Sequence, residues 1–132
     1  MVYRRLRMTE SPVRFWLGPP MKEFKNPLTQ KEITELKDKF GNYLKLTIDL
    51  EKEIVVAGCL LHADGETRLL REGSKQSDIW GGGIDLANKV IDTTAVLNLR
   101  PNQDNNSLEI IDADKRKKFI NIVKDFFQKI WP

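Results

Sequence analysis

Alternating apolar and polar positions predict a strand near the middle of the chain. From Leu44 to Leu50 every second residue is apolar, and the residues between are mostly polar. Because successive side chains of a strand point to opposite faces, this period of two is typical of a strand with one buried face. Residues 54–62 follow and are apolar at nearly every position, which predicts a central strand covered on both sides.

Asp64 and Gly65 come shortly after this apolar run and predict a hairpin. The pair is a strong signal for a two-residue type I′ turn, because both central positions of that turn need a positive φ. A reversal at this point pairs His62 with Thr67 and places residues 58–72 in two antiparallel strands.

A further strand is predicted at residues 93–99, where the sequence TTAVLNL alternates again. Pro101 ends this strand because proline cannot donate to a sheet ladder, and the Asn-rich stretch 102–106 is expected to be a loop. The three glycines at 81–83 are expected to allow a bend, a bulge or a close backbone approach, with a short strand over 84–86.

Two amphipathic helices are predicted, one before and one after the strands. Thr29 and Glu32 have the spacing of a capping box, and Gly41 has the position of a C-terminal cap. The second helix is expected to begin at Asp112, with an apolar face made of Phe119, Ile120, Val123, Phe126, Phe127 and Ile130. We therefore predict an α+β fold, a mostly antiparallel sheet of four to six strands flanked by an N-terminal and a C-terminal helix.

The first part of the chain shows neither period. Four prolines interrupt it: Pro12, Pro19, Pro20 and Pro27. We predict an extended basic leader over residues 1–27 and a single α+β domain over residues 28–132. Residues 1–20 are expected either to be dispensable, with Met21 as an alternative start, or to form an arm that docks on a partner through Phe15, Trp16 and Leu17.

Charge and composition narrow the function classes. The chain has a formal net charge of +3, and the arginines of residues 1–21 account for all of it, so the remainder is formally neutral. A nucleic-acid-binding domain normally has a cationic folded surface, which counts against nucleic acid as the main partner. Apolar runs stay short of the roughly 18 residues of a membrane span, and we expect no secretory signal. The single cysteine, Cys59, fits a buried packing position in a cytoplasmic protein.

Polar and aromatic residues are concentrated between Gly58 and Gly83, and we interpret them as a candidate binding groove completed by the loop after residue 99. Arginine, tryptophan and amide side chains suit a peptide, a carboxylate or a small polar ligand. The candidate binding residues are His62, Arg71, Glu72, Ser74, Gln76, Asp78, Trp80, Arg100 and Asn102. The alternative is that these side chains satisfy one another, with either arginine paired to Glu72 or Asp78.

A metal site is a second interpretation of the same stretch. His62, Glu66 and Asp78 are candidate ligands for a divalent ion that would activate water for hydrolysis. No second histidine supports a zinc site. The nearby serines do not lie in a nucleophile elbow, and the glycine run lacks the Lys-Ser/Thr of a P-loop, so no specific motif implies a cofactor.

Two sequence blocks resemble a known family. The first runs from Leu61 to Gly81 as L-H-A-D-x-E and then G-S-x-Q-x-D-x-W-G, and the second is N-x-R-P, ending at Pro101. Over residues 28–130 the chain resembles a small family of prokaryotic proteins, a domain of unknown function, in which we expect an asparagine where this chain has Gly83. The resemblance implies no activity, cofactor or catalytic residue.

These observations favour a small binding or interaction module. The expected partner is a protein or a small polar ligand, and homodimerisation through an uncovered strand edge is an additional expectation. A metal-dependent hydrolase is the alternative, and nucleic-acid binding is the least favoured of the three. The sequence leaves open whether the protein is an enzyme.

Overall fold

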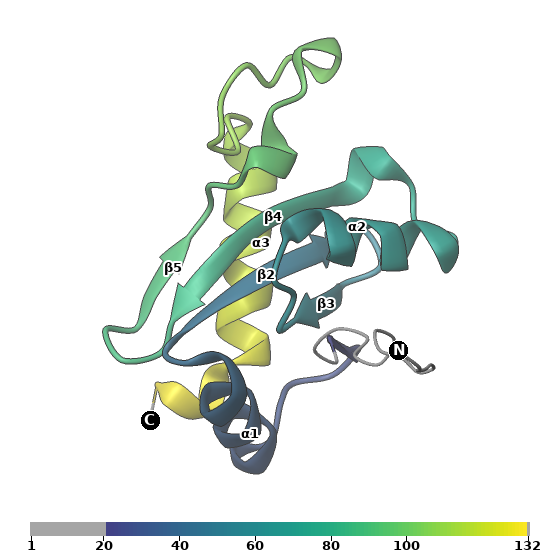
Figure 1. The fold of residues 1–132 in the computed structure, drawn as a ribbon. Helices are drawn as coiled ribbons and strands as arrows, with labels where there is room; N and C mark the ends of the chain where they lie inside the picture. Colours follow the sequence, from purple (N-terminus) through teal and green to yellow (C-terminus); the bar gives the residue numbers. More distant parts are fainter. Residues whose placement is uncertain (1–20, 132) are drawn as a thin grey trace, which may run out of the picture.

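A five-stranded antiparallel sheet forms the centre of the structure, a computed structural model that describes residues 21–131 (Figure 1). In spatial order its strands are β1 (Lys22–Phe24), β3 (Ile54–Ala57), β2 (Tyr43–Asp49), β4 (Ile79–Asp85) and β5 (Val90–Asp92). The helices are α1 (Gln30–Phe40), α2 (His62–Arg71) and α3 (Ala113–Phe126). The predicted α+β fold with a mostly antiparallel sheet is confirmed.

The two faces of the sheet follow the alternation of β2. Leu44, Leu46 and Ile48 are completely buried and belong to the main hydrophobic cluster with α3. The residues between them point to the opposite face, where Lys45 lies opposite Gly83 of β4. The polar half of the strand therefore lies on the side of the sheet that carries α2.

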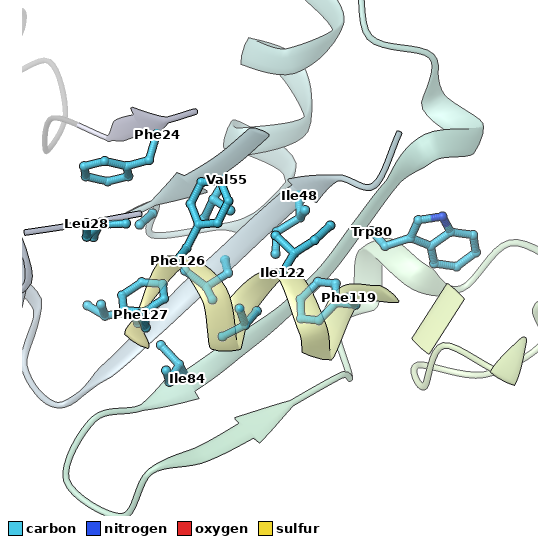
Figure 2. Close-up of a cluster of buried hydrophobic side chains, with 14 of the residues drawn as sticks. Phe24, Leu28, Ile48, Val55, Trp80, Ile84, Phe119, Ile122, Phe126 and Phe127 are labelled. Carbon is cyan, nitrogen blue, oxygen red and sulfur yellow. The ribbon is translucent and has the colours of Figure 1, made fainter. Parts of the chain in front are cut away.

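α3 closes the main core. Its N-cap is Asp112, whose carboxylate accepts from the Lys115 N–H at 2.9 Å, as the sequence predicts. Phe119, Ile122 and Phe126 pack along the sheet toward residues of β2, β3 and β4 (Figure 2). α1 contributes Ile33 and Leu36 to the same core, and its Thr29–Glu32 capping box and Gly41 cap are as predicted.

α2 crosses the other face at one end of the sheet (Figure 1). Leu69 of α2 packs with Ile54, Val56 and Ile79 in a second, smaller cluster. The helix lies so close to β2 that a Cβ at Gly65 would stand 2.6 Å from Oγ1 of Thr47.

The predicted hairpin at Asp64–Gly65 is wrong, because residues 62–71 form α2. Gly65 does not form a turn; its missing side chain lets the helix approach the sheet closely. The preceding strand is also shorter than predicted: β3 ends at Ala57, and Gly58 has φ 84°, where the chain leaves the sheet.

The predicted strand at 93–99 is wrong as well. Only one residue of this segment forms a β-bridge, Thr94 with Glu109, and residues 96–98 form a short 3-10 turn, η2 (Val96–Asn98). Residues 79–85 form a single strand, so the glycines lie inside β4 and the predicted short strand at 84–86 is its end.

The sheet begins inside the segment that the sequence assigns to the leader. β1 pairs with β3 over Lys22–Phe24, and both Phe24 and Leu28 are buried. Residues 1–20, which carry the dispensable-extension and docking-arm hypotheses, lie outside the described residues. Among the described helices, none has the length and apolar character needed to cross a membrane.

Candidate functional site

Arg100 is the most enclosed of the charged residues among the predicted binding residues, with an exposed fraction of 5%. Its guanidinium is directed at main-chain oxygens: Nε donates to Leu97 O at 3.1 Å, and Nη1 to Gln76 O at 2.9 Å. Nη2 donates to Ile79 O. Charged hydrogen bonds of this kind are stronger than neutral ones, so Arg100 ties the segment before β4 to the loop that follows η2.

Glu66 and Trp80 complete the cluster around Arg100. The carboxylate of Glu66 lies 3.9 Å from Nη2 of Arg100, and the guanidinium stands 4.4 Å from the centre of the Trp80 ring. Lys115 of α3 lies 5.1 Å from the same ring. Burial lowers the pKa of Arg100 and the charge of Glu66 raises it, and an arginine stays protonated under either influence. We call Glu66, Gln76, Trp80 and Arg100 the Arg100 cluster.

The other predicted groove residues do not join this cluster. Ser74 is buried and donates to Oδ2 of Asp49 at 2.6 Å. Asp78 and His62 are half-buried, while Arg71, Glu72 and Asn102 are exposed. The structure thus brings together Gln76, Trp80 and Arg100, and the carboxylate that pairs with Arg100 comes from Glu66.

Two buried asparagines, Asn98 and Asn105, hold the loop in place. The side chain of Asn98 accepts from Gly81 N at 2.8 Å and donates to Gly81 O at 2.9 Å. It pairs with β4 as the backbone of a neighbouring strand would. Nδ2 of Asn105 donates to Asn98 O at 2.8 Å, and its Oδ1 accepts from Ile111 N at 2.9 Å. The only sign of these buried asparagines in the sequence is the Asn-rich composition of the loop.

The glycines 81–83 lie beneath neighbouring side chains. The His62 ring covers the first glycine, where a Cβ would stand 3.0 Å from His62 Cδ2. Phe119 covers the second from the opposite face, and the phenol of Tyr43 covers the third. Of the three roles predicted for these glycines, close approach is the one they serve.

His62 is the first residue of α2 and fixes that end of the helix to the sheet. Its Nε2 lies 2.7 Å from Gly82 O, and Thr47 Oγ1 donates to His62 O at 3.2 Å. Since a carbonyl only accepts, Nε2 carries the hydrogen. Burial lowers the pKa of His62, and the charge of Lys45 lowers it further, while Gly82 O and Asp92 oppose the shift.

Two of the predicted metal ligands have other partners. His62 is directed at the β4 backbone, whereas Glu66 faces Arg100. Within residues 21–131 there is no group of three or more His, Cys, Asp or Glu side chains able to hold a metal ion. Cys59 is buried as expected, and burial raises the pKa of its thiol.

α2 does not cover the whole of its face of the sheet (Figure 1). Beyond His62, two rows of residues, each in register across neighbouring strands, are left uncovered by this helix. One row is Lys45, Gly83 and Asp92, in register across β2, β4 and β5. The next is Tyr43, Asp85 and Val90. We call these rows and the segment before α2 the open face: Tyr43, Lys45, Leu60, Leu61, Gly83, Asp85, Val90 and Asp92.

Large apolar side chains are exposed on this face. Tyr43 is 42% exposed, Val90 55%, Leu60 57% and Leu61 60%. The register places Tyr43 and Val90 on one side of the sheet, and Lys45 Nζ donates to Leu60 O at 2.8 Å. The two leucines therefore stand next to the rows of the open face.

The polar side chains of the open face are held in place by one another. Tyr43 donates to Oδ2 of Asp92 at 2.9 Å, and Thr94 Oγ1 donates to Oδ1 at 2.6 Å. Burial raises the pKa of Tyr43, as do the hydrogen bond to Asp92 and its charge. Tyr43, Lys45 and Asp92 are not among the predicted binding residues, because the polar positions of a half-buried strand are expected to face solvent.

A hollow of about 280 Å³ lies elsewhere, between β1 and the end of α1. None of the predicted binding residues lines it. Its lining residues are Lys22, Glu35, Leu36, Asp38, Lys39 and Phe40. Two lysines against two carboxylates leave this hollow without a preferred charge.

Comparison with protein-family models matches residues 23–126 to a family described as a protein of unknown function, DUF5674. The chain belongs to the DUF5674 family. The predicted resemblance to a domain of unknown function is confirmed, and the DUF5674 match begins within β1, earlier than residue 28. No curated protein and no solved structure matches the chain.

Proposed function

We propose that this DUF5674 protein is a binding module and that the open face is the surface that contacts its protein partner. The observation that carries the proposal is the exposure of Tyr43, Val90, Leu60 and Leu61 on a part of the sheet that α2 leaves uncovered. Contiguous exposed apolar surface is typical of protein interaction sites.

The polar groups of the open face support a protein partner. Tyrosine is enriched in interfaces because it combines a large apolar ring with a hydrogen-bonding group. The bonds from Tyr43 and Thr94 hold the Asp92 carboxylate in one position. A surface held in its binding conformation loses less entropy when a partner is bound.

A protein partner also agrees better with the shape of the molecule than a small ligand does. Small-molecule sites are concave, and the hollow of about 280 Å³ is lined by residues of β1 and α1, outside the open face. The metal-dependent hydrolase has no ligand cluster to support it within residues 21–131. The Arg100 cluster then serves as the support that fixes α2 and η2 beside the open face.

The test is a selection of binding peptides. A displayed library of random peptides is selected against the full chain, and the affinities of the selected peptides are measured by calorimetry. Leu61→Asp and Val90→Asp are each expected to weaken binding at least tenfold, about 1.4 kcal/mol, because each puts a charge into the apolar contact.

Leu70→Asp is the matched control. Leu70 is an exposed leucine, 43% accessible, on α2 but outside the open face. Its replacement is expected to leave the affinity unchanged. Failure to select peptides, or peptides equally sensitive to all three substitutions, would contradict the proposal.

A further inference from the structure

We infer that the partner of the open face is a second copy of this chain, arranged about a two-fold axis that runs along β4. The inference rests on the proposed function of the open face and names its occupant. It comes from the order of charges and apolar groups across the three strands.

Lys45 and Asp92 stand on either side of Gly83 in the same row. Neighbouring strands lie about 4.8 Å apart, so the two positions are separated by roughly 10 Å. Gly83 lies between them, beneath the phenol of Tyr43. A two-fold axis parallel to β4 and above Gly83 exchanges the two sides of the row. It places Lys45 of each copy opposite Asp92 of the partner subunit, and the ion pair forms twice.

The apolar groups are exchanged by the same axis. The segment between β3 and α2 lies over the β2 side of the open face (Figure 1). In this segment Leu60 O accepts from Lys45 Nζ, and Leu61 is the next residue. Val90 lies on the β5 side, which no helix covers within the described residues. The axis brings the leucines of one copy against Val90 of the partner subunit. The β2 side, with the segment before α2, thus meets the uncovered β5 side of the partner subunit.

Asp85 is the one charge that lies beneath this axis, opposite its own copy. Its carboxylate is turned into the β4–β5 connection, where Oδ1 accepts from Ala87 N and Asn88 N at 3.0 Å. Oδ2 accepts from Nδ2 of Asn88 at 2.9 Å. These bonds hold the charge away from the axis and lower the pKa of Asp85. A self-complementary patch of this kind is what a two-fold interface requires.

The test is the sedimentation of the full chain over a range of concentrations. The unmodified chain is expected to be a dimer. Lys45→Glu places two carboxylates opposite each other and is expected to weaken the dimer at least tenfold, and Asp92→Lys does the same with two ammonium groups. The double variant K45E/D92K restores both pairs and is expected to return dimer affinity to within a few-fold of the original.

Lys124→Glu, a charge reversal at an exposed position of α3, is the control and leaves the dimer unchanged. Asp92 accepts internal hydrogen bonds, so its replacement can destabilise the fold. Thermal unfolding of each variant therefore shows whether it is folded. Should Asp92→Lys unfold, Leu61→Asp replaces it, since it leaves both charges in place and is also expected to yield monomers.

The outcomes separate this inference from the proposed function. A monomer at every concentration, or a dimer insensitive to Lys45→Glu, overturns the inference. If Leu61-dependent peptide binding is found with that monomer, the open face still binds protein and only the second copy is excluded as the partner. A dimer that Lys45→Glu breaks and K45E/D92K restores supports the inference.

Discussion

The Arg100 cluster and the open face are both rich in polar and aromatic side chains, yet they differ in where their hydrogen bonds go. In the Arg100 cluster the guanidinium donates to three main-chain oxygens and lies on Trp80, which is 1% exposed. On the open face, Tyr43 and Lys45 make internal bonds while much of their neighbourhood stays accessible.

This difference separates a structural role from a binding role. Buried polar groups must be satisfied, because an unsatisfied one costs about 1–3 kcal/mol. A cluster that has met this requirement internally has little to offer a ligand. Exposed apolar side chains have no such internal partner, and a second surface can bury them. In this chain the unusual residues Trp80 and Arg100 therefore belong to buried structure.

The largest effect is expected for Arg100→Met. The substitution leaves Gln76 O and Ile79 O without their donor and Glu66 without its cation. Breaking a buried charged network of this kind costs about 3–5 kcal/mol. Urea unfolding measures the loss. Arg71→Met, at an exposed arginine, is the control and should stay within about 0.5 kcal/mol of the original chain. Equal effects of the two would show that the cluster is not a structural support.

A smaller loss is expected for Asn98→Ala. The substitution leaves Gly81 N–H without its acceptor at a completely buried position. The expected loss of unfolding free energy is about 1–3 kcal/mol, measured in the same unfolding experiment. Asn102→Ala removes an exposed asparagine from the same loop and is expected to be neutral. A neutral Asn98→Ala would mean that the loop is held by other contacts.

Much of the fold could be predicted because its signals are local. The capping box at Thr29, the alternation of β2 and the N-cap Asp112 each depend on residues a few positions apart. The sequence does not reveal α2, because Asp64 and Gly65 form the pattern of a turn. The actual role of Gly65 depends on Thr47, which is distant in sequence and close only after the helix packs on β2.

The candidate site divides in the same way. His62, Trp80 and Arg100 are recognisable as unusual residues in the sequence, but their partners are not. The open face depends on the register that aligns Lys45 with Asp92 across β4. No local pattern specifies which positions of three strands share a row, so this surface could be found only from the structure.

The next largest effect is a pH dependence of the unfolding free energy, caused by His62. This residue begins α2, between the Arg100 cluster and the open face. Its pKa is lowered in the folded chain below the ordinary value of 6.5. Above pH 6.5 the His62 ring is neutral in both the folded and the unfolded chain, and its full contribution to stability is present. As the pH falls below 6.5 the unfolded chain binds the proton first, so stability is lost until the pH passes the folded pKa.

The variant His62→Gln keeps a donor for Gly82 O and removes the titration. The unfolding free energy of the original chain is expected to fall relative to this variant between pH 7 and pH 5. The carboxylates are the same in both proteins, so their contribution largely cancels in the difference. His62 is the only histidine of the chain, and NMR can follow its ring directly. A difference that does not change with pH would contradict the lowered pKa.

The smallest effect on stability is expected for Tyr43→Phe, and it sharpens the contrast with Arg100 most directly. The substitution removes the 2.9 Å bond to Asp92 but keeps the ring over Gly83. Because the site is exposed and Thr94 still donates to Asp92, the stability change should stay within about 0.5 kcal/mol. Dimer affinity measured by sedimentation should not fall, since the Asp92 carboxylate stays available to Lys45 of the partner subunit. A loss of several kcal/mol would instead make the open face a buried network like that of Arg100.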